Sequence, residues 1–201
     1  MAVSEVDICN LALARVGQDV IVNLTDTGRS ARLCNLLYEP SRDQLLRSYR
    51  WKFAIKRTEL AASATAPDHG YTYSYPLPTD CLRVLSVSEE DPEFDPDLDP
   101  ALWDIEDGEL VTDKVAPLPI KYIARIEDTN QFDPCFIDAL TAYMAYKLAP
   151  SLRESETDVI AALKSDFKEI MEGARYVNAI ESRRMKRRYT RSSWVLGNEY
   201  Y

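Results

Sequence analysis

The amino-acid sequence predicts an α+β fold: an antiparallel helical bundle with an inserted small antiparallel β domain and an extended C-terminal tail. Apolar residues recur at helical spacing within residues 1–60 and again within 128–182. Between these parts, residues 61–127 change to an alternating pattern from Tyr71 onward, rich in aromatic and β-branched residues. Residues 183–201 have no apolar periodicity. We therefore expect a helical bundle domain over 1–60 and 128–182, an inserted β domain over 61–127 and a tail over 183–201.

Local signals place the two N-terminal helices. Ser4 can cap the first, with Asp7 three residues later, and Gly17 can end it. A second helix is expected from residue 26 or 27 to about Trp51. Pro40 removes one backbone donor, so we expect a kink or a restarted turn there. The first helix is expected to bury one face that contains Ile8, Leu11, Ala12 and Val16.

The C-terminal helices are predicted in the same way. Asp133 precedes Pro134, a residue favoured in the first turn, and Pro150 is expected to end that helix. Ser155 and Asp158 mark the start of a last helix. Its apolar face extends over more than six turns through Val159, Leu163, Phe167, Ile170, Ala174, Val177 and Ile180.

Within the β domain, residues 102–112 are predicted to form a hairpin. Asp107 and Gly108 lie between two alternating runs, and this dipeptide favours a tight type I′ turn. Trp51 and Phe53 precede the domain and are expected to pack where it joins the bundle.

Charge is distributed unevenly along the 201 residues, whose formal net charge is -9. Residues 89–113 hold twelve acidic residues and no basic ones, whereas 183–191 hold six basic residues and no acidic ones. Blocks of opposite charge are typical of interaction surfaces. Arg57 and Arg83 could pair with carboxylates of another chain, but a single surface pair contributes about 0–1 kcal/mol, so no function is assigned to either.

Cysteine usage and hydropathy indicate where the protein folds. The four cysteines form no CxxC pair, and two lie on apolar helical faces, which favours buried, reduced thiols. No apolar run approaches the roughly 18 residues of a spanning helix, and the N-terminus does not resemble a signal peptide. We expect a protein made in the cytoplasm without membrane association.

Catalytic and metal-binding patterns are weak. The lone histidine, His69, lies in a Pro/Gly loop with no nucleophile context, so we expect no enzyme and no cofactor. The segment 95–106 places acids at four ligand positions of a calcium loop, but Pro100 occupies the position that requires glycine. The expected role of this segment is a solvated acidic loop, and no metal site is predicted.

The C-terminal tail combines cations with aromatic residues. Such a composition is typical of nonspecific nucleic-acid binding, where cations meet phosphate and rings stack on bases. The same residue types dominate protein interfaces, so docking on an acidic protein surface is an equal alternative. Trp194 and the two terminal tyrosines argue against a tail that serves solubility alone.

Four stretches together carry a family resemblance over most of the chain up to about residue 180: ICNLALARVGQ, ARLCNLLYEPSRDQLLRSYRWKFAIKRTEL, YSYPLPTDCLRV and FIDALTAYMAYKLAP. In this ordered pattern the chain resembles the head-to-tail adaptor proteins of tailed bacteriophages, particularly the tail tubular protein A group of short-tailed phages. None of the stretches is a catalytic fingerprint, and the acidic insert and the last twenty residues are less typical of the family.

The resemblance implies a structural virion protein at the head-to-tail junction, assembled in the host cytoplasm. Such adaptors form a ring, commonly of twelve copies, between the portal protein and the tail nozzle protein. Some members also carry tail fibres, and DNA passes through the lumen without specific recognition. The alternative is a nucleic-acid-binding factor that uses the basic aromatic tail.

Two sets of partner-binding residues follow. Related adaptors often use the C-terminal segment to reach into the portal, so the tail is expected to bind the portal or a neighbouring subunit. Its candidate residues are Arg183, Arg184, Lys186, Arg187, Arg188, Arg191, Trp194, Tyr200 and Tyr201.

The acidic segment has two open roles. Facing the lumen it would repel DNA, and facing outward it would offer a surface to a basic nozzle or fibre protein. The outward role is favoured, because an inserted hairpin readily extends a surface. The candidate platform residues are Asp95, Asp97, Asp99, Asp104 and Glu106.

Overall fold

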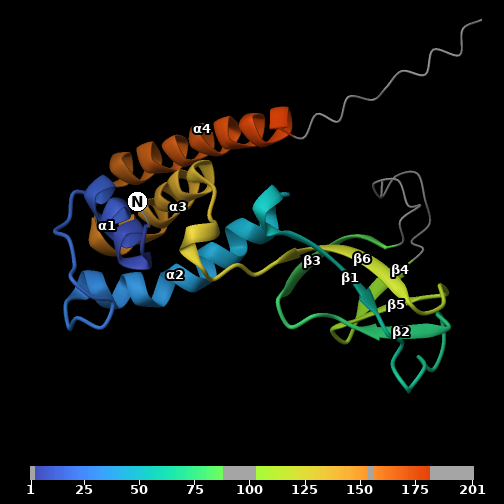
Figure 1. Ribbon diagram of the computed structural model, residues 1–201. Helices are drawn as coiled ribbons and strands as arrows, with labels where there is room; N and C mark the ends of the chain where they lie inside the picture. The colour runs from blue at the N-terminus through green and yellow to red at the C-terminus, as the bar shows by residue number, and fades with distance from the viewer. Residues whose placement is uncertain (1–2, 88–102, 154–155, 182–201) are drawn as a thin grey trace, which may run out of the picture.

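The computed structural model describes residues 3–87, 103–153 and 156–181 (Figure 1). This part of the chain contains helices and antiparallel strands, which confirms the predicted α+β class. Its helices are α1 (Glu5–Val16), α2 (Arg29–Ser48), α3 (Pro134–Leu152) and α4 (Thr157–Glu181), with short 3-10 turns η1 (Lys52–Ala54) and η2 (Thr129–Gln131). Its strands are β1 (Ile55–Leu60), β2 (Tyr73–Pro76), β3 (Cys81–Val87), β4 (Trp103–Glu106), β5 (Glu109–Thr112) and β6 (Leu118–Ala124).

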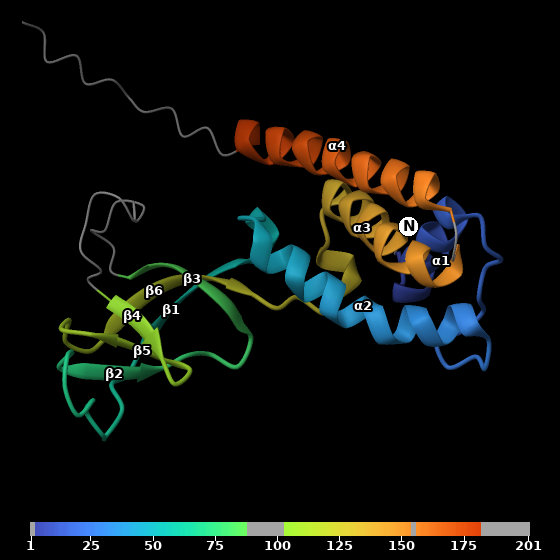
Figure 2. The same cartoon turned by 180° about the vertical axis from the view of Figure 1, so that it is seen from behind.

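The helices pack around α3, which contacts α1, α2 and α4 (Figures 1 and 2). Most of α3 is apolar, and its buried side chains include Phe136, Leu140, Met144 and Leu148. Arg15 on α1 holds α3 and α4 from outside, with guanidinium nitrogens 2.5 Å from Asp138 and 2.7 Å from Asp166. In the described residues no helix has the length and apolar character needed to cross a membrane.

The predicted start and end of α1 are both confirmed. The Asp7 backbone N–H donates to the Ser4 hydroxyl at 3.1 Å, and the Ser4 backbone N–H donates to the Asp7 carboxylate at 2.9 Å. Gly17 follows with a φ of 71°, the left-handed conformation that ends a helix readily at glycine. Leu11 was predicted on the buried face but is 49% exposed. The side chains that α1 buries are instead Ile8, Cys9, Ala12, Leu13 and Val16, which occupy another part of the helix surface.

The structure corrects two predictions that rested on internal prolines, because α2 does not restart at Pro40 and α3 does not end at Pro150. α2 is one continuous helix through Pro40, and it begins at Arg29 with Gly28 as its N-cap. α3 continues past Pro150 to Leu152. A proline removes only one backbone donor, and contacts of the flanking turns with neighbouring helices keep the helix intact.

The strands form two three-stranded antiparallel sheets, with orders β1-β6-β3 and β2-β5-β4. The predicted hairpin over 102–112 is confirmed by β4 and β5. Asp107 and Gly108 join them with φ values of 49° and 79°, and a type I′ turn requires positive φ at both positions. β1 lies ahead of the alternating pattern and was not predicted. β6 pairs with β1 and sets its register, so that Ile55 of β1 lies opposite Ile123 of β6.

An aromatic cluster lies where the helices meet the strands. Trp51 is 1% exposed and its ring centroid lies 5.1 Å from that of Phe136. Phe53 contacts Phe136 and Phe132 at 5.1 and 5.9 Å between centroids. The Trp51 indole N–H donates to the Leu45 carbonyl at 3.1 Å. Trp51 and Phe53 therefore lie in the core between α2, α3 and β1, as their aromatic character predicted.

Candidate functional site

The last two turns of α4 leave part of its apolar face uncovered. Leu163, Met171 and Ala174 are buried, but Tyr176, Val177 and Ile180 are 69%, 42% and 50% exposed. The sequence predicted one apolar face through Ile180. The structure ends its burial near Ala174, because α4 extends past the end of α3 toward the strands (Figure 1). We call Tyr176, Val177 and Ile180 the α4 patch.

The α4 patch is held in a fixed position by hydrogen bonds to the segment between α2 and β1. The Tyr49 hydroxyl donates to the Arg175 carbonyl at 3.2 Å. The Asn178 side-chain amide donates to the Arg50 carbonyl at 3.0 Å, and its oxygen accepts from the Lys52 backbone N–H at 3.4 Å. The patch therefore belongs to an ordered helix end, and its three apolar side chains point away from these anchoring contacts.

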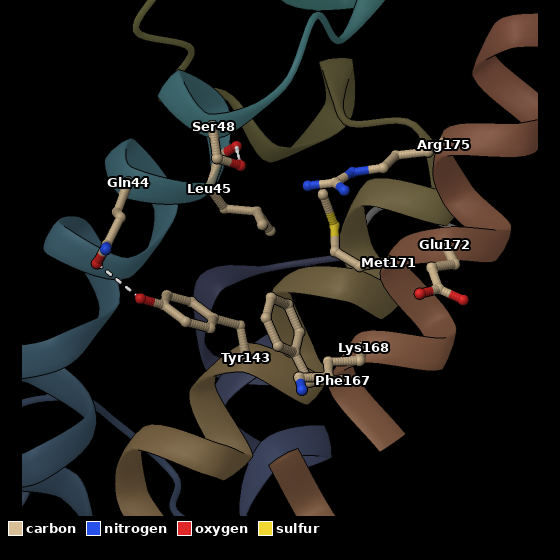
Figure 3. Close-up of a pocket in the computed structure, with 9 residues that line it drawn as sticks. All are labelled: Gln44, Leu45, Ser48, Tyr143, Phe167, Lys168, Met171, Glu172 and Arg175. Carbon is tan, nitrogen blue, oxygen red and sulfur yellow. Dashed lines mark hydrogen bonds between the residues drawn. The ribbon is translucent and has the colours of Figure 1, made fainter. Parts of the chain in front are cut away.

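A pocket of about 290 Å³ opens beside this helix end, with α2 and α4 as walls and α3 as floor (Figure 3). Its apolar lining includes Leu45, Tyr143, Phe167 and Met171. The Tyr143 and Phe167 rings lie 4.9 Å apart, and the Tyr143 hydroxyl donates to the Gln44 side-chain oxygen at 2.7 Å. The size suits one large side chain better than a whole ligand, since ligand pockets are about 300–1,000 Å³.

Charged side chains surround the mouth of this pocket. Arg175 extends across it from α4, while Glu172 points away (Figure 3). The Arg175 guanidinium lies 5.6 Å from the Tyr49 ring centroid, so it is held by a cation–π contact. Lys168 lies at the opposite rim. An apolar lining with cations at the rim fits an apolar anchor from a partner protein that also carries acidic groups.

A second candidate surface lies on the sheet of β1, β6 and β3. Arg57 on β1 is directly opposite Lys121 on β6, and Arg83 on β3 is opposite Ile123, two residues further along β6. Alternation along β6 places Lys121 and Ile123 on the same side of the sheet. Arg57, Lys121 and Arg83 therefore lie on the same side of the sheet, and we call these three residues the basic face.

The cations of the basic face have no carboxylate partner in the part of the chain that the structure describes. Burial lowers the pKa of Arg83, and the nearby Arg50 and Arg47 guanidinium groups lower it further. Like charges directly opposite on neighbouring strands, as with Arg57 and Lys121, are destabilising. This arrangement is unfavourable in one isolated copy and would be relieved by an anionic partner.

The acidic hairpin formed by β4 and β5 is the third candidate surface. Asp104, Glu106 and Asp107 are exposed, and none has a cationic partner among the described residues. Glu109 differs, because its carboxylate accepts hydrogen bonds from the hydroxyls of Ser63 and Ser74. We use the name acidic hairpin for Asp104, Glu106 and Asp107 alone.

Asp80 and Tyr122 have shifted pKa values, and the contacts that shift them hold the sheet of β1, β6 and β3 together. Burial opposes ionisation of Asp80, but hydrogen bonds from the Lys56 ammonium at 2.8 Å and the Tyr122 hydroxyl at 3.1 Å lower its pKa overall. Burial, with the charge and hydrogen bond of Asp80, raises the pKa of Tyr122 to about 12. This contact links β1 and β6 to the loop before β3 and stabilises the sheet.

The histidine and cysteine side chains of the described residues have the following surroundings. They contain no group of three or more His, Cys, Asp or Glu side chains placed to hold a metal. His69 is exposed in its loop. Cys9 and Cys34 are buried free thiols on α1 and α2, and their mutual hydrogen bond, followed by burial, raises the pKa of Cys9. These thiols are core residues.

The predicted partner-binding residues divide between described and undescribed parts of the chain. Asp104 and Glu106 lie in the acidic hairpin. Asp95, Asp97 and Asp99 lie outside the described residues, as do all nine tail candidates from Arg183 to Tyr201. The sequence did not predict the α4 patch as a surface, nor that Lys121 joins Arg57 and Arg83. No protein-family model matches the chain, and the search of curated proteins finds no match.

Proposed function

We propose that this protein is a structural head-to-tail adaptor of a tailed bacteriophage, forming a ring between the portal and the tail nozzle. The observation that carries the proposal is the α4 patch. An ordered helix end exposes three large apolar side chains directly before the basic, aromatic segment 183–201. Exposed apolar residues gathered on one helix face mark a protein-binding surface.

The α4 patch and the tail would work together. Tail cations pair with acidic portal surface, aromatic residues enter apolar pockets, and the patch supplies the rigid base of the contact. Many copies in one ring strengthen such a modest contact through effective concentration. In this proposal the strands, which lie on the same side of the helical part as the end of α4, provide a platform for the nozzle and, in some phages, fibres (Figure 2).

The pocket beside the patch supports the same proposal. Its rim cations, Lys168 and Arg175, and its apolar lining suit an aromatic or aliphatic side chain of an acidic portal segment. Filling this pocket is therefore predicted to interfere with docking. Met171→Trp, which adds bulk beside Phe167, provides that test in the full-length chain.

The deciding experiment mixes the purified protein with the portal ring of its phage and examines capping by sedimentation and negative-stain imaging. We expect the full chain to cap the ring and a chain stopped after Ile180 to fail. A variant with Trp194, Tyr200 and Tyr201 changed to Ala keeps every cation, and it is expected to lose most of the binding.

Duplex DNA provides the contrasting probe. If neither the full chain nor the truncated chain binds portal, while the full chain alone retards duplex DNA, the adaptor proposal is wrong. The alternative of a nucleic-acid-binding factor then takes its place. In that case the Trp194, Tyr200 and Tyr201 variant would retain most duplex binding, because its phosphate contacts remain.

A further inference from the structure

We infer that the basic face of one copy binds the acidic hairpin of a second copy, so that neighbouring subunits join head to tail through this contact. The inference rests on the proposed function for its setting in a ring, but its evidence is the charge arrangement of the described residues. It assigns Asp104 and Glu106 to a neighbouring subunit instead of a nozzle or fibre protein.

The two surfaces are complementary in number and sign. Arg57, Lys121 and Arg83 share one side of a sheet, and three exposed carboxylates lie within the four residues 104–107. Within one copy, no ion pair joins the two groups in the described residues, and neither group has another ionic partner there. Each is therefore available to a second molecule.

The acidic hairpin and Arg57 lie at sheet edges, whereas Lys121 on the central strand β6 and Arg83 on the edge strand β3 are half-buried. β4 is an edge strand of one sheet, and β1 and β3 are the two edges of the other. Arg57 and the acidic hairpin residues are exposed, and Ile105 between two of the acids is 42% exposed. The contact thus combines charge pairs with an apolar side chain, as protein interfaces do.

A second copy fits the basic face better than duplex DNA does. Duplex DNA is an extended row of phosphates that is normally bound through many cations, whereas the basic face holds three. A neighbouring copy brings a compact acidic hairpin with matched charges. Because the two surfaces are different parts of the chain, their contact is heterologous, and such contacts close into rings when the rotation per subunit permits.

The test begins with carbodiimide cross-linking, which joins a lysine amine to a carboxylate in direct contact. An equal mixture of unlabelled and isotope-labelled full-length chains is cross-linked alone and on the portal ring. We expect mixed-label peptides that join Lys121 to Asp104 or Glu106, decreasing with added salt. If neither sample gives them, the inference is wrong.

Charge reversal then tests the pairing. Arg57→Glu with Lys121→Glu, and separately Asp104→Lys with Glu106→Lys, are each expected to weaken self-association about tenfold or more. Mixing the two variants is expected to restore association, because the reversed face of one variant complements the reversed hairpin of the other, and their unchanged surfaces complement each other as well. Reversal to Glu at the exposed Arg32 and Lys164 makes the same change in net charge as the basic-face variant and serves as its control.

The outcomes separate this inference from the proposed function. If the mixed variants do not restore association, or if the control reversal has the same effect, the head-to-tail contact is refuted. Loss of duplex DNA binding by the basic-face variant, with self-association intact, would assign the face to nucleic acid. Portal capping through the tail is a separate readout, so the adaptor proposal can stand while this contact fails. Neutral Gln substitutions at Arg57 and Lys121 replace the Glu variant if that variant does not fold.

Discussion

The helices α3 and α4 lie side by side, yet they have different relations to solvent. α3 is surrounded by α1, α2 and α4, and its Phe136, Leu140 and Met144 are fully buried. α4 has one apolar stripe, buried at Leu163 and Met171 and exposed at Val177 and Ile180. Substitutions in α3 should therefore change stability, whereas substitutions at the end of α4 should change binding. The following predictions test that difference, in order of expected effect on stability.

Phe136→Ala is expected to cause the largest loss of stability. Phe136 contacts Trp51, Phe53 and Phe132 at the centre of the aromatic cluster, and no large side chain is free to fill the space. Truncation of a buried Phe costs about 3–5 kcal/mol. Urea unfolding of the full chain measures the change. Phe136→Leu, which keeps most of the volume, should cost much less, and equal losses for both would show that the cluster is not tightly packed.

Gly17→Ala should have the next largest effect. Gly17 has a φ of 71°, and an added Cβ would lie 2.3 Å from a guanidinium nitrogen of Arg153. That side chain donates to the Val16 carbonyl at 2.8 Å, so displacing it also removes a cap of α1. We expect a loss of about 1–2 kcal/mol in the free energy of unfolding. Gly173, in the interior of α4, has open space around an added Cβ and no positive φ, so Gly173→Ala is the control and should be neutral or slightly stabilising.

Asp80→Asn should destabilise the protein by about 1 kcal/mol at neutral pH, after allowing for solvent screening. The pKa of Asp80 is lowered in the folded state, so its contribution is complete above the ordinary carboxyl value and is lost as pH falls through the lower folded value. The difference between wild type and variant should therefore shrink in acid. Thermal unfolding at several pH values tests this, and a constant difference would contradict the ion-pair explanation.

Val177→Ser with Ile180→Ser should change stability least. Both side chains are exposed, and surface substitutions usually alter the free energy of unfolding by less than about 0.5 kcal/mol. Under the proposed function, the same variant should cosediment poorly with the portal ring. The matched change Leu11→Ser removes an exposed apolar residue from α1 and should leave portal binding intact. Normal portal binding by the α4 variant would show that the patch is not a docking surface.

Sequence alone determined the features that depend on a few neighbouring residues. Ser4 with Asp7, Asp133 before Pro134, and Asp107 with Gly108 each act through local hydrogen bonds or local φ preferences, so the structure matches all three. The change from helical to alternating periodicity likewise determined the α+β class, because each period reflects which side chains one element can bury.

Tertiary structure alone decided which predicted faces are covered. Val177 and Ile180 belong to the apolar stripe that the sequence predicts for α4, yet they are 42% and 50% exposed, because burial depends on which elements lie beside each part of the helix. β1 forms because β6 lies beside it, and that pairing brings Arg57 opposite Lys121, on the same side of the sheet as Arg83. Sequence patterns record the period of each segment, whereas exposure and charge proximity depend on segments that are distant along the chain and meet only after folding.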